Sequence, residues 1–283
     1  MRPELNFVFH RNYSFAAQRW LSLLTTAIAA LMSVAVLWWL SIRYGRPDFF
    51  SGYSLLGTCF ILALLSVRKR LLAVPLGSVN VWLQIHVYTG ILALVLFLCH
   101  VGMLNGGWLE SLLASSFLWV ALSGLYLWYL SRTSPRKLLA MGRDVVFEEI
   151  PRLQREYADE AYKLALQSTQ LGEGVTLADY YHRELIGYFH SPRGFWFGLF
   201  PSLRKRRRIL RELDGLDRYL GADGRAIRDQ ICDLVRKKDE LDFHWAIQNR
   251  MRLWTTLHLS GLWALGLLIA VHVVSVLAFA QRG

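Results

Sequence analysis

The sequence predicts an all-α integral membrane protein, a helical bundle with about five transmembrane helices and a helical cytoplasmic insert. Its residues are 54% hydrophobic and only 19% charged, with a mean hydropathy of +0.30. A soluble protein of this length usually carries more charge. Five long apolar stretches contain no charged residue. The 11 tryptophans and 12 tyrosines suit a chain that has two membrane interfaces to line.

The apolar stretches set the predicted domain organisation. A bilayer core about 30 Å thick needs about 20 apolar residues in a helix. The second stretch is the shortest of the five, and the first is too long for a signal peptide, so we expect it to be retained. We predict a membrane domain at 1–130, an insert at 131–250 and a final span at 251–283. The five stretches cover residues 20–42, 50–67, 81–104, 111–130 and 253–280.

Basic residues at the ends of these stretches predict the orientation. The N-terminal tail, the loop at 68–70 and the start of the insert are all basic, and five spans would put them on one side. Cytoplasmic loops of membrane proteins are enriched in Lys and Arg. We therefore expect a bacterial-type inner (cytoplasmic) membrane protein with a cytoplasmic N-terminus and its C-terminus on the outer side.

The insert is highly charged, with 22 basic and 18 acidic residues between 131 and 250. Its apolar periodicity predicts several helices. Ser134 and Pro135 are expected to open the first one. The last one starts near Asp223 and can continue into the final span, because no Pro or Gly interrupts residues 226–260.

Two of the predicted spans each carry a pair of histidines. His86 and His100 lie on the third span, and His258 and His272 lie on the fifth. The two histidines of each pair are 14 residues apart. In an α-helix this separation is about 40° short of four full turns, so both histidines face nearly the same way, about 21 Å apart along the axis. In parallel spans, His86 would lie level with His258 and His100 level with His272. Each level pair could hold one six-coordinate haem, and these four residues are the predicted iron ligands.

Small and hydroxyl residues near these histidines support the same hypothesis. A flat cofactor needs small neighbours, and we expect Gly90, Gly261 and Gly266 to lie beside the haems, although small residues are common in membrane helices. The second nitrogen of each ring should contact a carbonyl or hydroxyl oxygen. Nearby candidates for that role are Thr89, Thr255 and Thr256.

A histidine inside a membrane can instead bond to a neighbouring helix or relay protons. Transporters usually also bury carboxylates or lysines in their spans, and the apolar stretches of this chain contain none. Two pairs with the same spacing therefore favour haem ligation. Covalent attachment of haem is not indicated, because no CxxCH motif accompanies the three cysteines.

The histidine pattern resembles that of di-haem integral membrane cytochrome b subunits, both the ferric-reductase-like type and the respiratory type. The resemblance rests on His86, His100, His258 and His272 and covers the membrane part alone. It implies two non-covalent haem b groups and transmembrane electron transfer within a respiratory or quinone-linked oxidoreductase complex. Expected partners are the lipid bilayer, the quinone pool and a c-type cytochrome or iron–sulfur subunit, with no nucleic acid.

Two alternatives remain open at this point. The chain could be a self-contained quinol or metal reductase, which would need a substrate pocket beside one haem, or a haem-free membrane anchor or transporter. We find no catalytic motif, and no GxGxxG unit for a nicotinamide or flavin cofactor is present.

Three further features have open interpretations. His244 lies 14 residues before His258 and could ligate a third haem or line a quinone pocket, but we favour an ordinary polar residue of the insert. The aromatic run at 194–200, followed by five cations at 204–208, suits docking to an anionic membrane surface or to a partner subunit. Cations near the inner face could pair with haem propionates or only set the topology; they are Arg68, Lys69, Arg70, Arg250 and Arg252.

Overall fold

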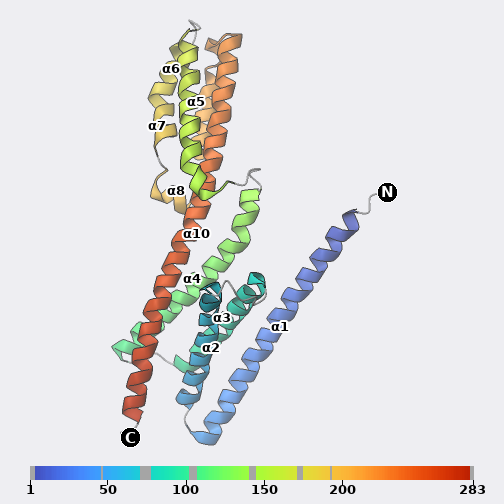
Figure 1. The fold of residues 1–283 in the computed structure, drawn as a ribbon, viewed down its shortest axis with the longest axis vertical. Coiled ribbons are helices and arrows are strands. Elements are labelled where there is room, and N and C mark those ends of the chain that lie inside the picture. The colour runs from blue at the N-terminus through green and yellow to red at the C-terminus, as the bar shows by residue number, and fades with distance from the viewer. Residues whose placement is uncertain are drawn as a thin grey trace. The chain divides into compact units, whose positions relative to one another are not determined.

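The computed structural model describes residues 4–45, 47–70, 78–101, 107–139, 145–170, 175–191 and 193–280. These residues are almost entirely helical, and no strand occurs among them, which confirms the all-α prediction. The chain folds as two units (Figure 1). The first unit comprises Met1–Leu125 with Ser260–Gly283, and the second comprises Tyr126–Leu259. The sequence predicted boundaries at 130/131 and 250/251.

The first unit contains the apolar helices. They are α1 (Glu4–Tyr44), α2 (Pro47–Arg70), α3 (Val79–Val101) and parts of α4 (Trp108–Leu139) and α10 (Ala222–Ala280). Helix α2 packs along α3, and α1 contacts both. Gly45 has a φ of 64°, a left-handed conformation that glycine adopts without strain, and it ends α1 just before Pro47 opens α2.

Four helices are long and apolar enough to cross a membrane, judged among the described residues. Their apolar parts lie in Leu23–Tyr44, Val81–Val101, Trp108–Pro135 and the second half of α10. The predicted count was about five. The exception is α2, whose apolar part Phe49–Leu65 is shorter because the helix ends in Arg68, Lys69 and Arg70. Helix α4 also runs through Pro135, where the sequence predicted the start of a separate helix.

The core of the first unit is small and lies between four helices. Its buried members are Ala93 and Phe97 of α3, Ala114 and Phe117 of α4, and Leu265 of α10, with partly buried residues of α2 around them. The rings of Phe97 and Phe117 stack at 4.3 Å and 10°. None of the described residues of α1 belongs to this core, so α1 is a peripheral helix of the unit.

The second unit is a helical domain with a conventional apolar core. It contains α5 (Ile150–Gln170), α6 (Val175–Tyr180), a π-helical segment (Tyr181–Leu185), α7 (Ile186–His190), α8 (Phe195–Leu199), α9 (Arg204–Gly215) and the first part of α10. Short 3₁₀ turns lie at Phe147–Glu149 and Asp217–Tyr219. Helices α5, α6 and α7 lie beside α10 in Figure 1, and their shared core includes Leu177, Tyr188, Leu213 and Val235.

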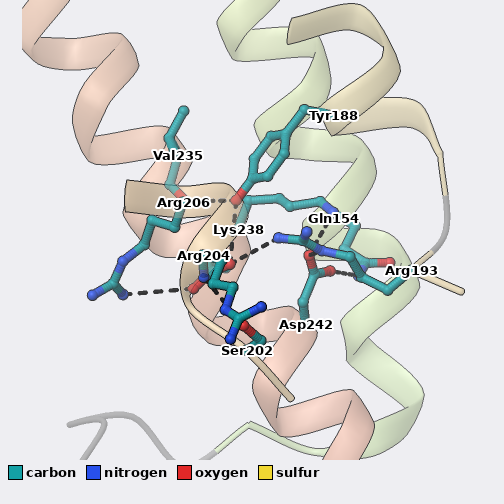
Figure 2. Close-up of polar contacts among 10 residues, drawn as sticks. Gln154, Tyr188, Arg193, Ser202, Arg204, Arg206, Val235, Lys238 and Asp242 are labelled. Carbon is teal, nitrogen blue, oxygen red and sulfur yellow. Dashed lines mark hydrogen bonds and ion pairs between the residues drawn. The ribbon is translucent and has the colours of Figure 1, made fainter. Parts of the chain in front are cut away.

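Next to this core, the second unit buries a network of charged side chains (Figure 2). Arg193 Nη2 lies 2.8 Å from Asp239 Oδ1, and Arg193 Nε lies 2.6 Å from Asp242 Oδ2. Lys238 Nζ reaches the same Asp242 oxygen at 2.6 Å, and Gln154 Nε2 donates to its other oxygen at 2.9 Å. Burial raises the pKa of Asp239, while the neighbouring Arg193 opposes that shift. The network joins the segment that leads into α8 to the first part of α10.

Candidate functional site

The four predicted ligands lie on two unbroken helices. Helix α3 carries His86 and His100, and α10 carries His258 and His272. Because both helices continue through the intervening residues, each pair is separated by about 21 Å along its axis. All four side chains are partly buried. The 14-residue spacing of each pair therefore lies within one continuous helix.

Helix α2 positions His100. The Oγ of Ser51, itself a buried residue, lies 3.0 Å from His100 Nδ1. The next residue, Gly52, lies directly against the ring, since a Cβ at this position would come within 3.0 Å of His100 Cε1. A hydroxyl that accepts a hydrogen bond from Nδ1–H directs the opposite nitrogen, Nε2, toward a metal. Ser51 and Gly52 thus set the ring orientation of His100 from a neighbouring helix.

The same helix positions His86. Its Nδ1 lies 3.3 Å from the backbone carbonyl oxygen of Leu62 on α2. A carbonyl oxygen only accepts hydrogen bonds, so a neutral His86 in this contact carries its proton on Nδ1. Gly90 lies one turn further along α3, and a Cβ at this glycine would have the side chain of Leu62 as its nearest neighbour, at 4.0 Å. Both histidines of α3 therefore rest on α2.

The oxygens beside His86 and His100 belong to α2, whereas the predicted candidates for the four histidines were the hydroxyls of Thr89, Thr255 and Thr256. The hydroxyls of Thr255 and Thr256 donate to the carbonyls of Met251 and Arg252 in their own helix. This backbone bond is the usual arrangement for threonine inside a helix. For His86 and His100, α2 supplies the contacts in place of Thr89 and the other two threonines. Only tertiary packing could reveal this, because α2 lies 24 to 49 residues away in sequence.

A cavity of about 400 Å³ lies within the first unit, and both His100 and His272 line it. Its volume falls in the range of cofactor and small-molecule sites. The walls are mostly apolar and come from α2, α3, α4 and α10, and the only carboxylate among the described lining residues belongs to Glu110. Other lining residues include Gly52, Cys59, Phe97, Phe117, Leu265 and Ile269.

These residues fit a haem. Its iron takes two axial side chains, because the porphyrin supplies the other four donors, and His100 and His272 are two imidazoles on one apolar cavity. Gly52 allows α2 to pack directly against the His100 ring, where any larger side chain would displace the imidazole. Within the described ranges, no three His, Cys, Asp or Glu side chains are grouped as ligands for a bare metal ion would be.

The second predicted pair is divided between the two units. His86 belongs to the first unit and His258 to the second, so their joint ligation of a haem stays a prediction.

The two glycines of α10 have different surroundings. A Cβ on Gly261 would lie 2.8 Å from Trp119 Cδ1, so this glycine permits a close approach of α4 to α10. Gly266 is exposed and has no neighbour within 4 Å among the described atoms.

Two of the cations suggested as propionate partners, Arg250 and Arg252, make contacts within the second unit, to which both belong. Arg250 Nη1 donates to the carbonyl of Leu199 at 3.0 Å, and Arg252 Nη2 lies 2.6 Å from Glu148 Oε1. The side chains of residues 68–70 lie outside the described part of the chain.

His244 is buried, with 2% of its surface exposed, although we expected an ordinary polar residue of the insert.

Comparison with known proteins adds no relative: no family model, no curated protein and no solved structure matches this chain.

Proposed function

We propose that the chain is the membrane subunit of an oxidoreductase complex and carries electrons across a bilayer by means of two non-covalently bound haem b groups. The observation that supports this most is the apolar cavity of about 400 Å³ with His100 and His272 on its wall. The repeated 14-residue spacing of His86–His100 and His258–His272 adds a second level on the same two helices.

At the outer level, His100 and His272 are the proposed axial ligands. Ser51 holds the Nδ1 side of His100, which leaves Nε2 to face the cavity. The stacked rings of Phe97 and Phe117 and the side chain of Leu265 keep water from the site. Haem supplies one-electron redox chemistry when bound, while these side chains set its orientation and the polarity around it.

At the inner level, His86 and His258 are the proposed ligands. The Leu62 carbonyl fixes the tautomer of His86, so that its Nε2 is the coordinating nitrogen. Gly90 is the proposed small residue at this level, whereas on α10 Gly261 lies against Trp119 and Gly266 is exposed.

The chain's surroundings follow from the same proposal. Four apolar helices support insertion in a membrane, and the basic loops favour a cytoplasmic N-terminus in a bacterial-type inner membrane. The quinone pool and a c-type cytochrome or iron–sulfur subunit are the proposed redox partners. A self-contained quinol or metal reductase is the alternative, and co-purification of a redox subunit from the native membrane would separate the two.

The test is a set of ligand variants of the full chain in detergent. His272→Ala should retain one haem b of two in a pyridine haemochrome assay, and His258→Ala should also lose one. Their reduced spectra should differ, because each variant keeps a different haem. The control is His190→Ala, which changes an exposed histidine of α7 and should keep both haems. Unchanged haem content in His272→Ala would refute the assignment of the outer ligands.

A further inference from the structure

We propose that α8 is an interfacial anchor, whose aromatic side chains insert in the headgroup region of the bilayer that α10 enters. The exposed aromatic residues are Phe195 and Trp196 in α8 and Phe200 directly after it, and the proposed haem sites use none of them. The inference rests on the membrane insertion of α10 that the proposed function includes, and is independent of haem binding.

The aromatic side chains of this segment are unusually exposed. Phe195 is 66% exposed, Trp196 is 72% and Phe200 is 73%. The rings of Phe195 and Trp196 lie 5.9 Å apart, so they form one patch and not scattered residues. Contiguous exposed apolar surface marks a protein or membrane contact. Aromatic rings are also the side chains that membrane–water interfaces favour.

Helix α8 is packed against one short stretch of α10. A Cβ on Gly198 would lie 3.7 Å from the ring of Trp245 and 3.9 Å from Asn249 Nδ2. The carbonyl of Leu199 accepts the hydrogen bond from Arg250. Phe197 turns inward and meets Phe243 edge-on, with ring centroids 5.5 Å apart. Because Phe197 and Gly198 face α10, the exposed rings of Phe195, Trp196 and Phe200 face away from it.

The position along α10 gives the depth of α8. The charge-free apolar run of α10 begins at Leu253, three residues after Arg250 and four after Asn249. The contacts of α8 extend from Arg250, three residues before that run, back to Phe243, ten residues before it. At about 1.5 Å per residue they lie about 5–15 Å before the run, with the C-terminal end of α8 nearest to it. Headgroup regions are about 5–7 Å thick on each side of the hydrocarbon core. The end of α8, at Leu199 and Phe200, therefore lies at the depth at which aromatic belts occur.

A second segment is attached to α10 at the same level. Gln248 Nε2 donates to the carbonyl of Val145 at 3.0 Å, and Arg252 pairs with Glu148. The guanidinium of Arg252 also lies 3.9 Å from the ring centroid of Phe147. Both segments therefore contact α10 just before its apolar run, at one end of the second unit.

The buried ion network holds the start of α8 in place. The Arg193 guanidinium lies 4.8 Å from the ring centroids of both Tyr188 and Phe197. It also pairs with Asp239 and with Asp242, and Figure 2 shows Arg193 beside Asp242. Because Arg193 is only two residues before Phe195, these contacts fix the direction in which the chain enters α8. The aromatic patch is therefore presented by a rigid support.

The basic run at 204–208 contributes little to this anchor. Arg206 lies 3.6 Å from Asp239, and Arg208 pairs with Glu212 and Glu184. Asp239 is 14 residues before Leu253, about 21 Å along the helix. That distance exceeds the headgroup thickness by more than one Debye length of about 8–10 Å at physiological salt. We therefore assign the anchor to the aromatic rings and not to Arg206 or Arg208.

The experiment measures the depth of nitroxide labels on the full chain in phosphatidylcholine bilayers. Single cysteines are introduced after Cys59, Cys99 and Cys232 have been replaced by alanine. Labels at Trp196→Cys and Phe200→Cys should collide more with oxygen than with a water-soluble nickel chelate. The matched control is Tyr219→Cys, an exposed aromatic position three residues before α10 begins, and it should behave in the opposite way.

A label at Val274→Cys, on an exposed position of the apolar part of α10, tests the membrane insertion itself. If this label is in lipid while those at 196 and 200 resemble the label at 219, the anchor is refuted and insertion stands. Labels at 196 and 200 that are shielded from both reagents would identify a protein contact and overturn the proposal. A water-exposed label at 274 would contradict the proposed membrane function as well.

Discussion

The two units of this chain differ in where they place their large apolar side chains. In the second unit, apolar residues such as Leu213 and Val235 fill the interior, as in a water-soluble domain. In the first unit, large apolar residues such as Leu31 and Leu267 are exposed, while Ser51, Thr58 and Ser123 are buried. In hydrocarbon, exposed apolar surface is not penalised, and polar groups need internal partners.

The two units therefore depend on different contacts to select a single native structure. The core of a soluble domain is stabilised by the apolar area removed from water. Many of its buried residues can therefore be replaced by another apolar residue of similar volume. A membrane bundle lacks that driving force, and its few internal polar contacts and close helix approaches carry more of the specificity. The contacts of α2 with His86 and His100 are of this kind. The following variants test the comparison, starting from the largest expected effect.

Arg193→Met should strongly destabilise the second unit. The change leaves Asp239 and Asp242 buried beside one fewer cation, and breaking a buried ion pair costs about 3–5 kcal/mol. Urea unfolding followed by hydrogen exchange in α5, α7 and the first part of α10 measures the loss. The control is Arg152→Met, which removes an exposed pair with Glu156 worth at most about 0.5 kcal/mol. Similar losses in both variants would mean that the buried network contributes nothing particular.

Leu213→Ala should destabilise the second unit by about 2–5 kcal/mol, because it opens a cavity in a fully buried position. The same substitution at Leu267, which is 69% exposed on the apolar part of α10, should leave stability in a bilayer unchanged. Thermal unfolding of the reconstituted chain compares the two. Equal destabilisation would contradict the inverted pattern of burial described above.

Ser51→Ala should weaken haem binding at the outer level by about 10- to 100-fold, the usual effect of removing the residue that orients a metal-bound histidine. It should also raise the midpoint potential of that haem. A ring that no longer donates to Ser51 is a poorer electron donor to ferric iron. Redox titration measures both effects.

The control for this variant is Ser54→Ala, whose hydroxyl donates to the Phe50 carbonyl of its own helix. It should leave both potentials unchanged. If Ser51→Ala had the same titration as Ser54→Ala, the contact with His100 would have no role in the site.

Gly52→Ala should have the smallest effect. Its Cβ would come within 3.0 Å of the His100 ring, so the imidazole must move by a few tenths of an ångström. We expect a slightly weakened outer site, measured as a shift in the electron paramagnetic resonance signal of the low-spin ferric form. Gly57→Ala, at a position on α2 with no neighbour within 4 Å, is the matched variant and should leave the signal unchanged.

The sequence was informative where a property depends on one helix alone. The length of the apolar runs predicted the helices, and the absence of Pro and Gly between 226 and 260 predicted the continuous helix α10, which runs from Ala222 to Ala280. The histidine spacing is also a property of single helices. These features follow from a rise of about 1.5 Å per residue and need no tertiary information.

Features that join distant helices could not be predicted. The Ser51–His100 contact spans 49 residues, and Arg193 reaches Asp239 and Asp242 over 46 and 49 residues. A signal for the ion network was present, because Lys238, Asp239 and Asp242 interrupt an otherwise apolar face of α10 that includes Leu234 and Leu241. The identity of their partner depended on how the short helices α7 and α8 fold back, which no local pattern specifies.

The proposed function requires that histidines on α3 and α10 bind two haems. The most direct measurement is the haem content and reduced-minus-oxidised spectrum of the full chain purified in detergent. The account predicts two molecules of protohaem per chain, extractable by acid acetone because neither is covalently attached, with a reduced α-band near those of b-type cytochromes. A purified, folded chain that contains no protohaem after expression with adequate haem supply would contradict it.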